Sequence, residues 1–357
     1  MDKLWWNHIT KAHKFMEDIA AAALEGKSVV LSLPENVPWR NTLIELVEDR
    51  LKLGNPKNSF EILPCPKEEV GFFLLHRFCK KERIAAYRYG MTYAEFLGQC
   101  RDTVLNDRYL WITDIPQEKY DEWLEFITVY QKNATEKAPA VFILETNDAA
   151  FAKRTRKGMR QLVFDQHIGA YDKFAFCALA ATENSCKDHL RPYLAELAAT
   201  ICGDDMELCA ACVSMGAAFV KDPADTVRRI AAEKCRSSGQ AFHFSKTDEQ
   251  MKRLVWETQI KNVFPVIEKY RGSFIKKYDS QIKKALPISN SCGETVTIPE
   301  DVELGTLVYM AGCGFVCVNS REYQELEQFR DARNRLAHLD ILEPDAAEEV
   351  LKTGYAL

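Results

Sequence analysis

A group that can transfer protons and a permanently charged cation lie close together near the end of this sequence. Arg333 is followed by the polar Asn334 and, five residues after the arginine, by His338. Histidine titrates near neutrality, whereas a guanidinium stays protonated. On a helix, positions five apart are separated by about 140°, so the two side chains border one groove without touching. We therefore expect a second helix or a second subunit to complete a site here.

A purely structural interpretation competes with this one. Arg333 would then form an ion pair with Asp331, with Asp340 or with an acidic residue of another helix. His338 would cap the end of its helix, where an imidazolium complements the helix dipole. Both interpretations place the three residues on a helix near the carboxyl end of the chain.

The composition is that of a globular protein with two or three domains. The 357 residues are 47% hydrophobic and 28% charged, and the net charge of −5 argues against a protein that is basic overall and binds nucleic acid through its whole surface. The amino terminus lacks the pattern of a signal peptide, and no apolar run approaches the ~20 residues of a membrane helix. We expect a soluble, cytoplasmic protein without membrane contact.

The twelve cysteines lie mostly in apolar surroundings, which is typical of buried thiols in a reducing compartment. Cys209 and Cys212 form the one Cys-x-x-Cys pair, and because a structural zinc site usually needs two such pairs, we interpret them as core residues. Cys313 and Cys317 are also predicted to be core. Nothing in the sequence orients His189 toward Cys186 as a catalytic base. The sequence predicts no metal and no cofactor.

Short apolar strands alternate with longer helices in the first part of the chain, which predicts an α/β fold with a parallel sheet. The predicted strands are 28–33, 60–63, 109–115, 140–146 and a weaker 160–164; the predicted helices are 3–25, one through 43–51, 67–83, 92–106 and 117–133. The chain then becomes all-helical. We predict three domains: an α/β core at 1–168, a helical lid at 169–240 and a helical bundle at 241–357. The bundle would contain helices 247–285, 300–316, 320–339 and 344–352, with a kink at Pro265 and a loop at 286–299.

The order of sheet and helical lid resembles the AAA+ ATPases over about residues 20–236. Tyr109–Ile115 is similar to a Walker B strand and Val141–Thr146 to the sensor strand of that family. The phosphate-binding loop departs from the family. The Gly-Lys-Ser of residues 26–28 precedes a strand, whereas a working loop follows one and opens a helix. Residues 34–42 stand where the loop belongs and contain no glycine.

These departures predict a degenerate ATPase-like domain that acts as a scaffold or senses a partner, without ATP hydrolysis. Asp114, at the end of the Walker B-like strand, fits a magnesium ligand by position but lacks a second acidic residue. A turn or helix-capping aspartate is the preferred interpretation. Binding of ATP without a standard loop, as a weak nucleotide sensor, stays open as an alternative.

The bundle resembles a HEPN domain over about residues 247–355. Three segments carry the resemblance: Trp256–Arg271, Glu303–Leu307 and Arg333–His338. The resemblance implies metal-independent cleavage of RNA by attack of the 2′-hydroxyl, at a site on a dimer interface. It also implies that His338 is the general acid/base, Arg333 the cation beside the scissile phosphate and Asn334 a polar helper. Residues 246–284 carry ten Lys or Arg against five Asp or Glu, which favours a stripe that binds the RNA backbone, although a solvated helix face explains it equally well.

The sequence therefore predicts a HEPN-type ribonuclease fused to an inactive ATPase-like domain, in a phage-defence or toxin-like module. Its expected partners are RNA, a second copy of the chain through the bundle, and a protein bound by the first domain. The alternative is a non-catalytic adaptor in which both domains serve only for assembly.

Overall fold

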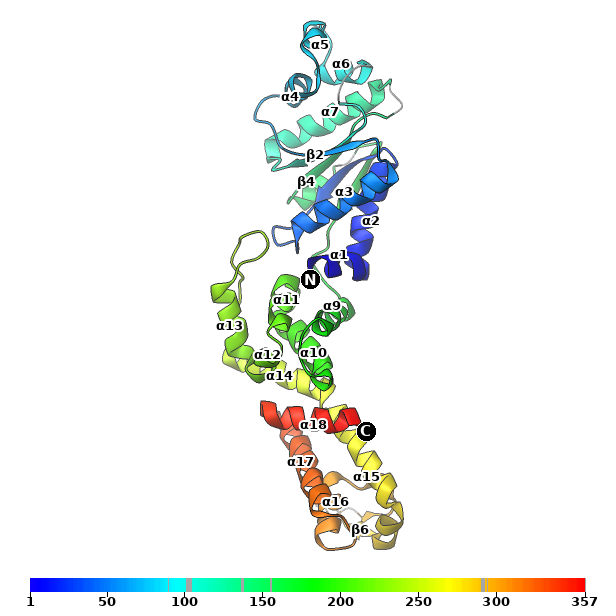
Figure 1. Cartoon of the computed structure of the whole chain (residues 1–357), viewed down its shortest axis with the longest axis vertical. Coiled ribbons are helices and arrows are strands. Elements are labelled where there is room, and N and C mark those ends of the chain that lie inside the picture. The colour runs from blue at the N-terminus through cyan, green and yellow to red at the C-terminus, as the bar shows by residue number, and fades with distance from the viewer. Residues whose placement is uncertain are drawn as a thin grey trace. The chain divides into compact units, whose positions relative to one another are not determined.

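The computed structural model describes residues 1–88, 90–100, 105–135, 138–154, 156–289, 293 and 295–356. The chain divides into two compact units, Met1–Ile168 and Gly169–Leu357 (Figure 1). The first is an α/β unit and the second is largely helical, as predicted for the coarse fold class. The predicted division at 240/241 stays a prediction, because helices on both sides of it pack together within the second unit.

A parallel sheet organises the first unit. Its described strands lie in the order β2-β3-β4-β1-β5, and every neighbouring pair is parallel. They are β1 (Ser28–Ser32), β2 (Ser59–Pro64), β3 (Arg108–Thr113), β4 (Val141–Thr146) and β5 (Met159–Val163). All five lie where strands were predicted. β1 is buried along its whole length, which explains why its sequence is a continuous apolar run without alternation.

Helices cover both faces of this sheet (Figure 1). The helices of the first unit are α1 (Asp2–His8), α2 (Thr10–Leu24), α3 (Arg40–Gly54), α4 (Val70–Phe78), α5 (Lys81–Ala85), α6 (Tyr93–Gln99), α7 (Tyr120–Asn133) and α8 (Ala149–Ala152), with a 3₁₀ turn η1 (Gln117–Lys119). The single helix predicted over 3–25 is wrong, because extended backbone at Ile9 separates α1 from α2. The helix predicted over 92–106 ends at Gln99, and residues 101–104 lie outside the described part.

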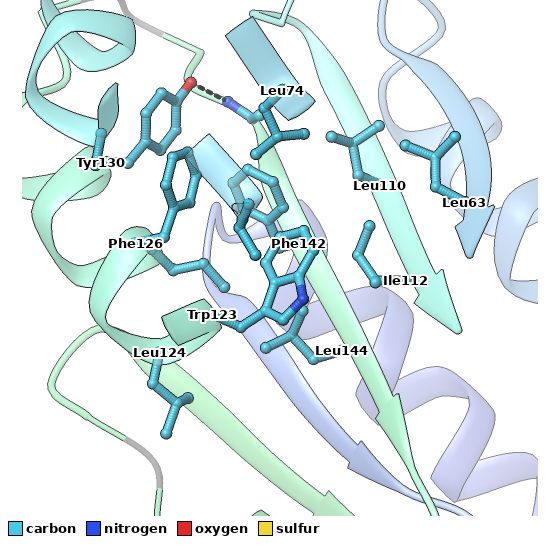
Figure 2. Close-up of a cluster of buried hydrophobic side chains, with 14 of the residues drawn as sticks. Leu63, Leu74, Leu110, Ile112, Trp123, Leu124, Phe126, Tyr130, Phe142 and Leu144 are labelled. Carbon is cyan, nitrogen blue, oxygen red and sulfur yellow. Dashed lines mark hydrogen bonds between the residues drawn. The ribbon is translucent and has the colours of Figure 1, made fainter. Parts of the chain in front are cut away.

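One face of the sheet holds a large aromatic and aliphatic core. Figure 2 shows Trp123, Phe126 and Tyr130 projecting from α7 toward Phe142 of β4. The Trp123 and Phe142 side chains are fully buried, and their ring centroids lie 6.0 Å apart. The Tyr130 hydroxyl accepts a hydrogen bond from the backbone N–H of Ala140 at 3.0 Å, so even its polar atom is satisfied. This core holds together the sheet of the predicted degenerate ATPase-like domain.

The second unit begins with the helices predicted as a lid and continues with those predicted as a bundle. Its elements are α9 (Ala170–Thr182), η2 (Asp188–Leu190), α10 (Arg191–Cys202), α11 (Met206–Ser214), α12 (Ala217–Lys221), α13 (Pro223–Glu233), α14 (Asp248–Asn262), α15 (Phe264–Ala285), η3 (Pro299–Asp301), α16 (Leu304–Gly312), α17 (Ser320–Ala337) and α18 (Pro344–Ala356). α15 contacts both α17 and α18 (Figure 1).

Two details of the bundle differ from the prediction. The long helix over 247–285 breaks at Val263, so that Pro265 occupies the second position of α15, where its missing N–H costs no hydrogen bond. The predicted loop at 286–299 carries a short antiparallel pair, β6 (Ile288–Ser289) and β7 (Thr295–Val296); residues 290–292 and 294 lie outside the described part.

The prediction that Cys313 and Cys317 are core is wrong. α16 ends at Gly312, and both thiols come after it in exposed positions. The apolar sequence continues beyond the end of α16, so the helical periodicity wrongly extended the helix to these two cysteines. Cys209 and Cys212, by contrast, are fully buried as predicted, with the Sγ atoms of Cys202 and Cys212 3.6 Å apart.

Candidate functional site: the arginine–histidine helix

The helix α17, which carries the predicted site residues, is held in place by a capping box and by contacts with α14 and α15. It begins with a capping box in which Asn319 and Glu322 satisfy each other's backbone N–H groups. Phe329 is buried and stacks on Tyr270 of α15, with ring centroids 3.8 Å apart. Near the other end, the Trp256 indole N–H donates to the carbonyl of Leu336 at 2.9 Å. α17 is therefore held at both ends.

Arg333 points from α17 toward the start of α16. Its side chain is 35% exposed, and its Nη2 atom lies 3.4 Å from the Oε2 atom of Glu303. A second, weak hydrogen bond joins its Nη1 atom to the Oδ1 atom of Asn334 at 3.4 Å. The structural alternative correctly foresaw an acidic partner from another helix, although that partner occupies the N-cap position of α16.

A pocket of about 240 Å³ surrounds this ion pair. Its walls come from α15, η3, α16 and α17, and its lining residues are Glu268, Arg271, Glu300, Asp301, Glu303, Leu304 and Arg333. Arg271 is held rigidly: its Nε atom donates to Glu268 at 2.8 Å and its Nη1 atom to the carbonyl oxygens of Glu300 and Val302. Two guanidiniums thus share one pocket with four carboxylates.

A second hollow, of about 520 Å³, adjoins the first along α15. The two share Arg271 and Glu300 in their linings, and the second adds Lys276 and Asp279. Lys269 and Lys276 are exposed and lie seven residues apart, hence on one face of α15. Lys276 lines this second hollow together with Arg271, and the carboxylates of Asp279 and Glu300 line it as well.

The predicted basic stripe over 246–284 is largely neutralised elsewhere. Six of its ten cations have carboxylate partners among the described residues: Lys252, Arg253, Lys261, Arg271, Lys277 and Lys283 pair with Asp340, Glu257, Glu196, Glu268, Glu322 and Asp279. The solvated-face interpretation therefore holds for much of the stripe, and the part next to the pocket is the part relevant to a site.

His338 lies at the C-cap of α17, as the structural alternative predicts. Its side chain is exposed, and that side chain forms no hydrogen bond or ion pair within the part of the chain that the structure describes. The helix closes in a Schellman motif, in which Asp340 N–H donates to the carbonyl of Arg335 and Leu339 N–H to that of Leu336. An exposed imidazole at this position is free to meet a substrate or a second copy of the chain.

Two contacts fix the chain segment after His338. The Lys252 ammonium, with the Arg335 guanidinium, holds the pKa of Asp340 below its ordinary value, so this carboxylate stays ionised at neutral pH. Further along, the buried Gln259 side chain donates to the carbonyl of Leu342 at 3.0 Å and accepts from its N–H at 2.8 Å. The chain leaving α17 is thereby anchored to α14.

Within one chain, Arg333 and His338 do not form a joined site. Arg333 turns into the pocket with Glu303, whereas His338 is exposed at the helix end, and the Asn334 side chain accepts a hydrogen bond from Arg333. Sequence reasoning did not assign roles to Glu303 or Arg271. Arg271 lay in the predicted stripe, but Glu303 gave no spacing signal, because thirty residues separate it from its partner.

The Gly-Lys-Ser of residues 26–28 lies at the wrong end of its strand for a phosphate-binding loop. Ser28 begins β1, and its buried hydroxyl accepts from the N–H of Phe142, while Lys27 pairs with Glu25 at 2.7 Å. The three residues are therefore at the amino end of the strand. Parallel sheets bind ligands at the opposite, carboxyl end of their strands.

At that carboxyl end, an ion pair occupies the position where a parallel sheet would bind the phosphates of a nucleotide. Arg40, the first residue of α3, makes two hydrogen bonds to Glu145 of β4, at 2.5 and 2.6 Å. The Trp111 indole of β3 donates to the same carboxylate at 2.6 Å, and Glu145 is only 13% exposed. Asp114 adopts a left-handed turn (φ 55°) and accepts from the Thr113 hydroxyl, so it is a turn residue and caps no helix.

No protein-family model matches the chain, and no curated protein does. Among the residues described, every helix is too short or too polar to span a bilayer. The same part of the chain contains no group of His, Cys, Asp and Glu side chains arranged to hold a metal ion. Any functional assignment therefore rests on the geometry of the site.

Leu339 offers a direct test of strain beside His338. It adopts a left-handed conformation (φ 59°) with a 67% exposed side chain, a combination that costs a branched residue about 1 kcal/mol relative to glycine. We expect Leu339→Gly to raise the free energy of unfolding by about 1 kcal/mol, measured by urea denaturation. Leu339→Ala keeps the Cβ atom and should gain nothing. Equal gains from both substitutions would contradict the strain argument.

Proposed function

We propose that the chain is a HEPN-type endoribonuclease that cleaves RNA without a metal ion. The observation that carries the proposal is the placement of the partly exposed Arg333 on α17, about one turn before the exposed end of that helix. Guanidiniums bind phosphate oxygens through forked hydrogen bonds. The same helix that supplies Arg333 ends in an exposed histidine.

In the proposed reaction, His338 removes the proton of the 2′-hydroxyl as that oxygen attacks the neighbouring phosphorus. The bond from phosphorus to the 5′-oxygen breaks, and the leaving oxygen takes a proton from solvent water. Arg333 stabilises the negative charge on the phosphate, and Asn334 steadies the guanidinium through its Oδ1 atom. A 2′,3′-cyclic phosphate and a free 5′-hydroxyl are the products.

Two copies of the chain would complete the site. Arg333 and His338 lie about 140° apart on α17, and Arg333 turns away into its own pocket. A second α17 across a two-fold axis would bring the histidine of one copy toward the arginine of the other. The exposed Leu339 beside His338 supports this arrangement, since an apolar side chain at the helix end gains from being covered.

The proposal is tested by incubating the full chain with end-labelled RNA in excess EDTA. Cleavage that leaves 2′,3′-cyclic phosphate ends, together with a dimer in sedimentation, is the expected result. Arg333→Ala should reduce the rate with the dimer preserved. A chain that dimerises and leaves RNA intact would instead support the adaptor function, which the neutralised lysines of α14 and α15 favour.

We further propose that the first unit is a degenerate AAA+-like scaffold. Its support is the Arg40–Glu145 pair at the carboxyl end of β1 and β4, together with the misplaced Gly-Lys-Ser. ATP should leave the melting temperature unchanged, and Lys27→Ala should make no difference to that result. Any stabilisation by ATP, whether or not Lys27→Ala removes it, would overturn this assignment and revive the nucleotide-sensor hypothesis.

A further inference from the structure

Glu303 makes an unusual side-chain contact for a residue at the start of a helix. It is the N-cap residue of α16, where side chains normally accept a hydrogen bond from the first turn, yet it makes no such capping bond. Its Oε2 atom instead lies 3.4 Å from the Nη2 atom of Arg333. The carboxylate is 64% exposed, so it can swing into water without leaving a buried charge.

The surroundings of this pair oppose an anion. Within the pocket, the carboxylates of Glu268, Glu300, Asp301 and Glu303 outnumber the two guanidiniums. Arg271 is already engaged by Glu268 and by two backbone carbonyls. Arg333 is consequently the pocket's cation with the fewest strong bonds, and Glu303 is the partner that a phosphate must displace to reach it.

We infer that Glu303 is a positioning residue that masks Arg333, and that RNA competes with its carboxylate for the guanidinium. This inference rests on the proposed ribonuclease function. Both ligands accept from the same planar donors, so the carboxylate and the phosphate exclude each other. Because the ion pair is exposed, it is weak, and RNA bound by the neighbouring cations displaces it at modest cost.

Replacing Glu303 by the uncharged glutamine tests whether its carboxylate masks Arg333. We expect Glu303→Gln to tighten binding of a fluorescent oligouridylate by about two- to fivefold, the range given by an exposed ion pair. Binding is measured by fluorescence anisotropy in the His338→Ala chain, which keeps the probe intact. The matched control is Glu327→Gln, because Glu327 pairs with Arg330 on the same helix outside the pocket and its loss changes the net charge equally.

A second comparison separates masking from general repulsion. With Arg333→Ala in place, Glu303→Gln should no longer tighten binding beyond Glu327→Gln. Equal effects of Glu303→Gln and Glu327→Gln, or an effect of Glu303→Gln that persists without Arg333, would overturn the mask alone. An oligouridylate that binds none of these chains would overturn the ribonuclease proposal and the mask with it.

Discussion

Replacement of His338 by alanine is expected to lower the rate of RNA cleavage in EDTA by at least about 100-fold, the scale of general acid–base catalysis. The imidazole is the proposed proton-transfer group, and alanine supplies no substitute. The side chain is exposed and makes no hydrogen bond or ion pair with the described residues, so its removal should leave folding intact. Cleavage is measured on end-labelled RNA, with the melting temperature recorded in parallel.

His243→Ala serves as the matched control, because His243 is also an exposed histidine of the second unit. It should cut RNA at the rate of the unaltered chain. If the two variants cut equally well, His338 has no catalytic role. If His338→Ala also lowers the melting temperature, the structural interpretation of the helix-end histidine is favoured.

Arg40→Leu is expected to destabilise the first unit by about 2–4 kcal/mol, near the range for removing one partner of a buried ion pair. The substitution leaves the Glu145 carboxylate, which is 13% exposed, with the Trp111 indole as its remaining side-chain donor. Glu145→Leu should cost less, because Arg40 is 34% exposed and can reach water with its charged end.

The double variant Arg40→Leu/Glu145→Leu should be more stable than Arg40→Leu alone, since no uncompensated carboxylate remains. Five of the six tryptophans lie in Met1–Ile168, so tryptophan fluorescence during urea unfolding reports mainly on this unit. Destabilisation that simply adds in the double variant would show that the two side chains do not act as a pair.

Local patterns were sufficient to predict the sheet. β1, β3 and β4 are short, largely buried apolar runs, and their length and flanking turn residues distinguish them from helices. The same reasoning failed at Ile9, where a residue with good helical surroundings adopts extended backbone. A break of that kind is decided by packing of the two helices, which a local pattern does not contain.

The candidate site was predictable only in part. Arg333 and His338 were found because they are close in sequence and have distinctive chemistry. Glu303 and Arg271 line the same pocket as Arg333 because of the packing of α15, α16 and α17. The ion pair between Arg40 and Glu145 was missed for the same reason, since 105 residues separate its partners.

The clamp between Gln259 and Leu342 has a consequence for motion at the end of α17. The primary amide presents one donor and one acceptor side by side, and it pairs with a backbone unit as a neighbouring strand would. If the segment after His338 moved away, the N–H and C=O groups of Leu342 and the buried side-chain amide of Gln259 would lose their hydrogen bonds to each other. Fluctuations of the imidazole are therefore confined to side-chain rotation on a nearly fixed backbone. The backbone that carries a group at this position is therefore in place before any encounter, and only the exposed side chain has to turn toward its partner.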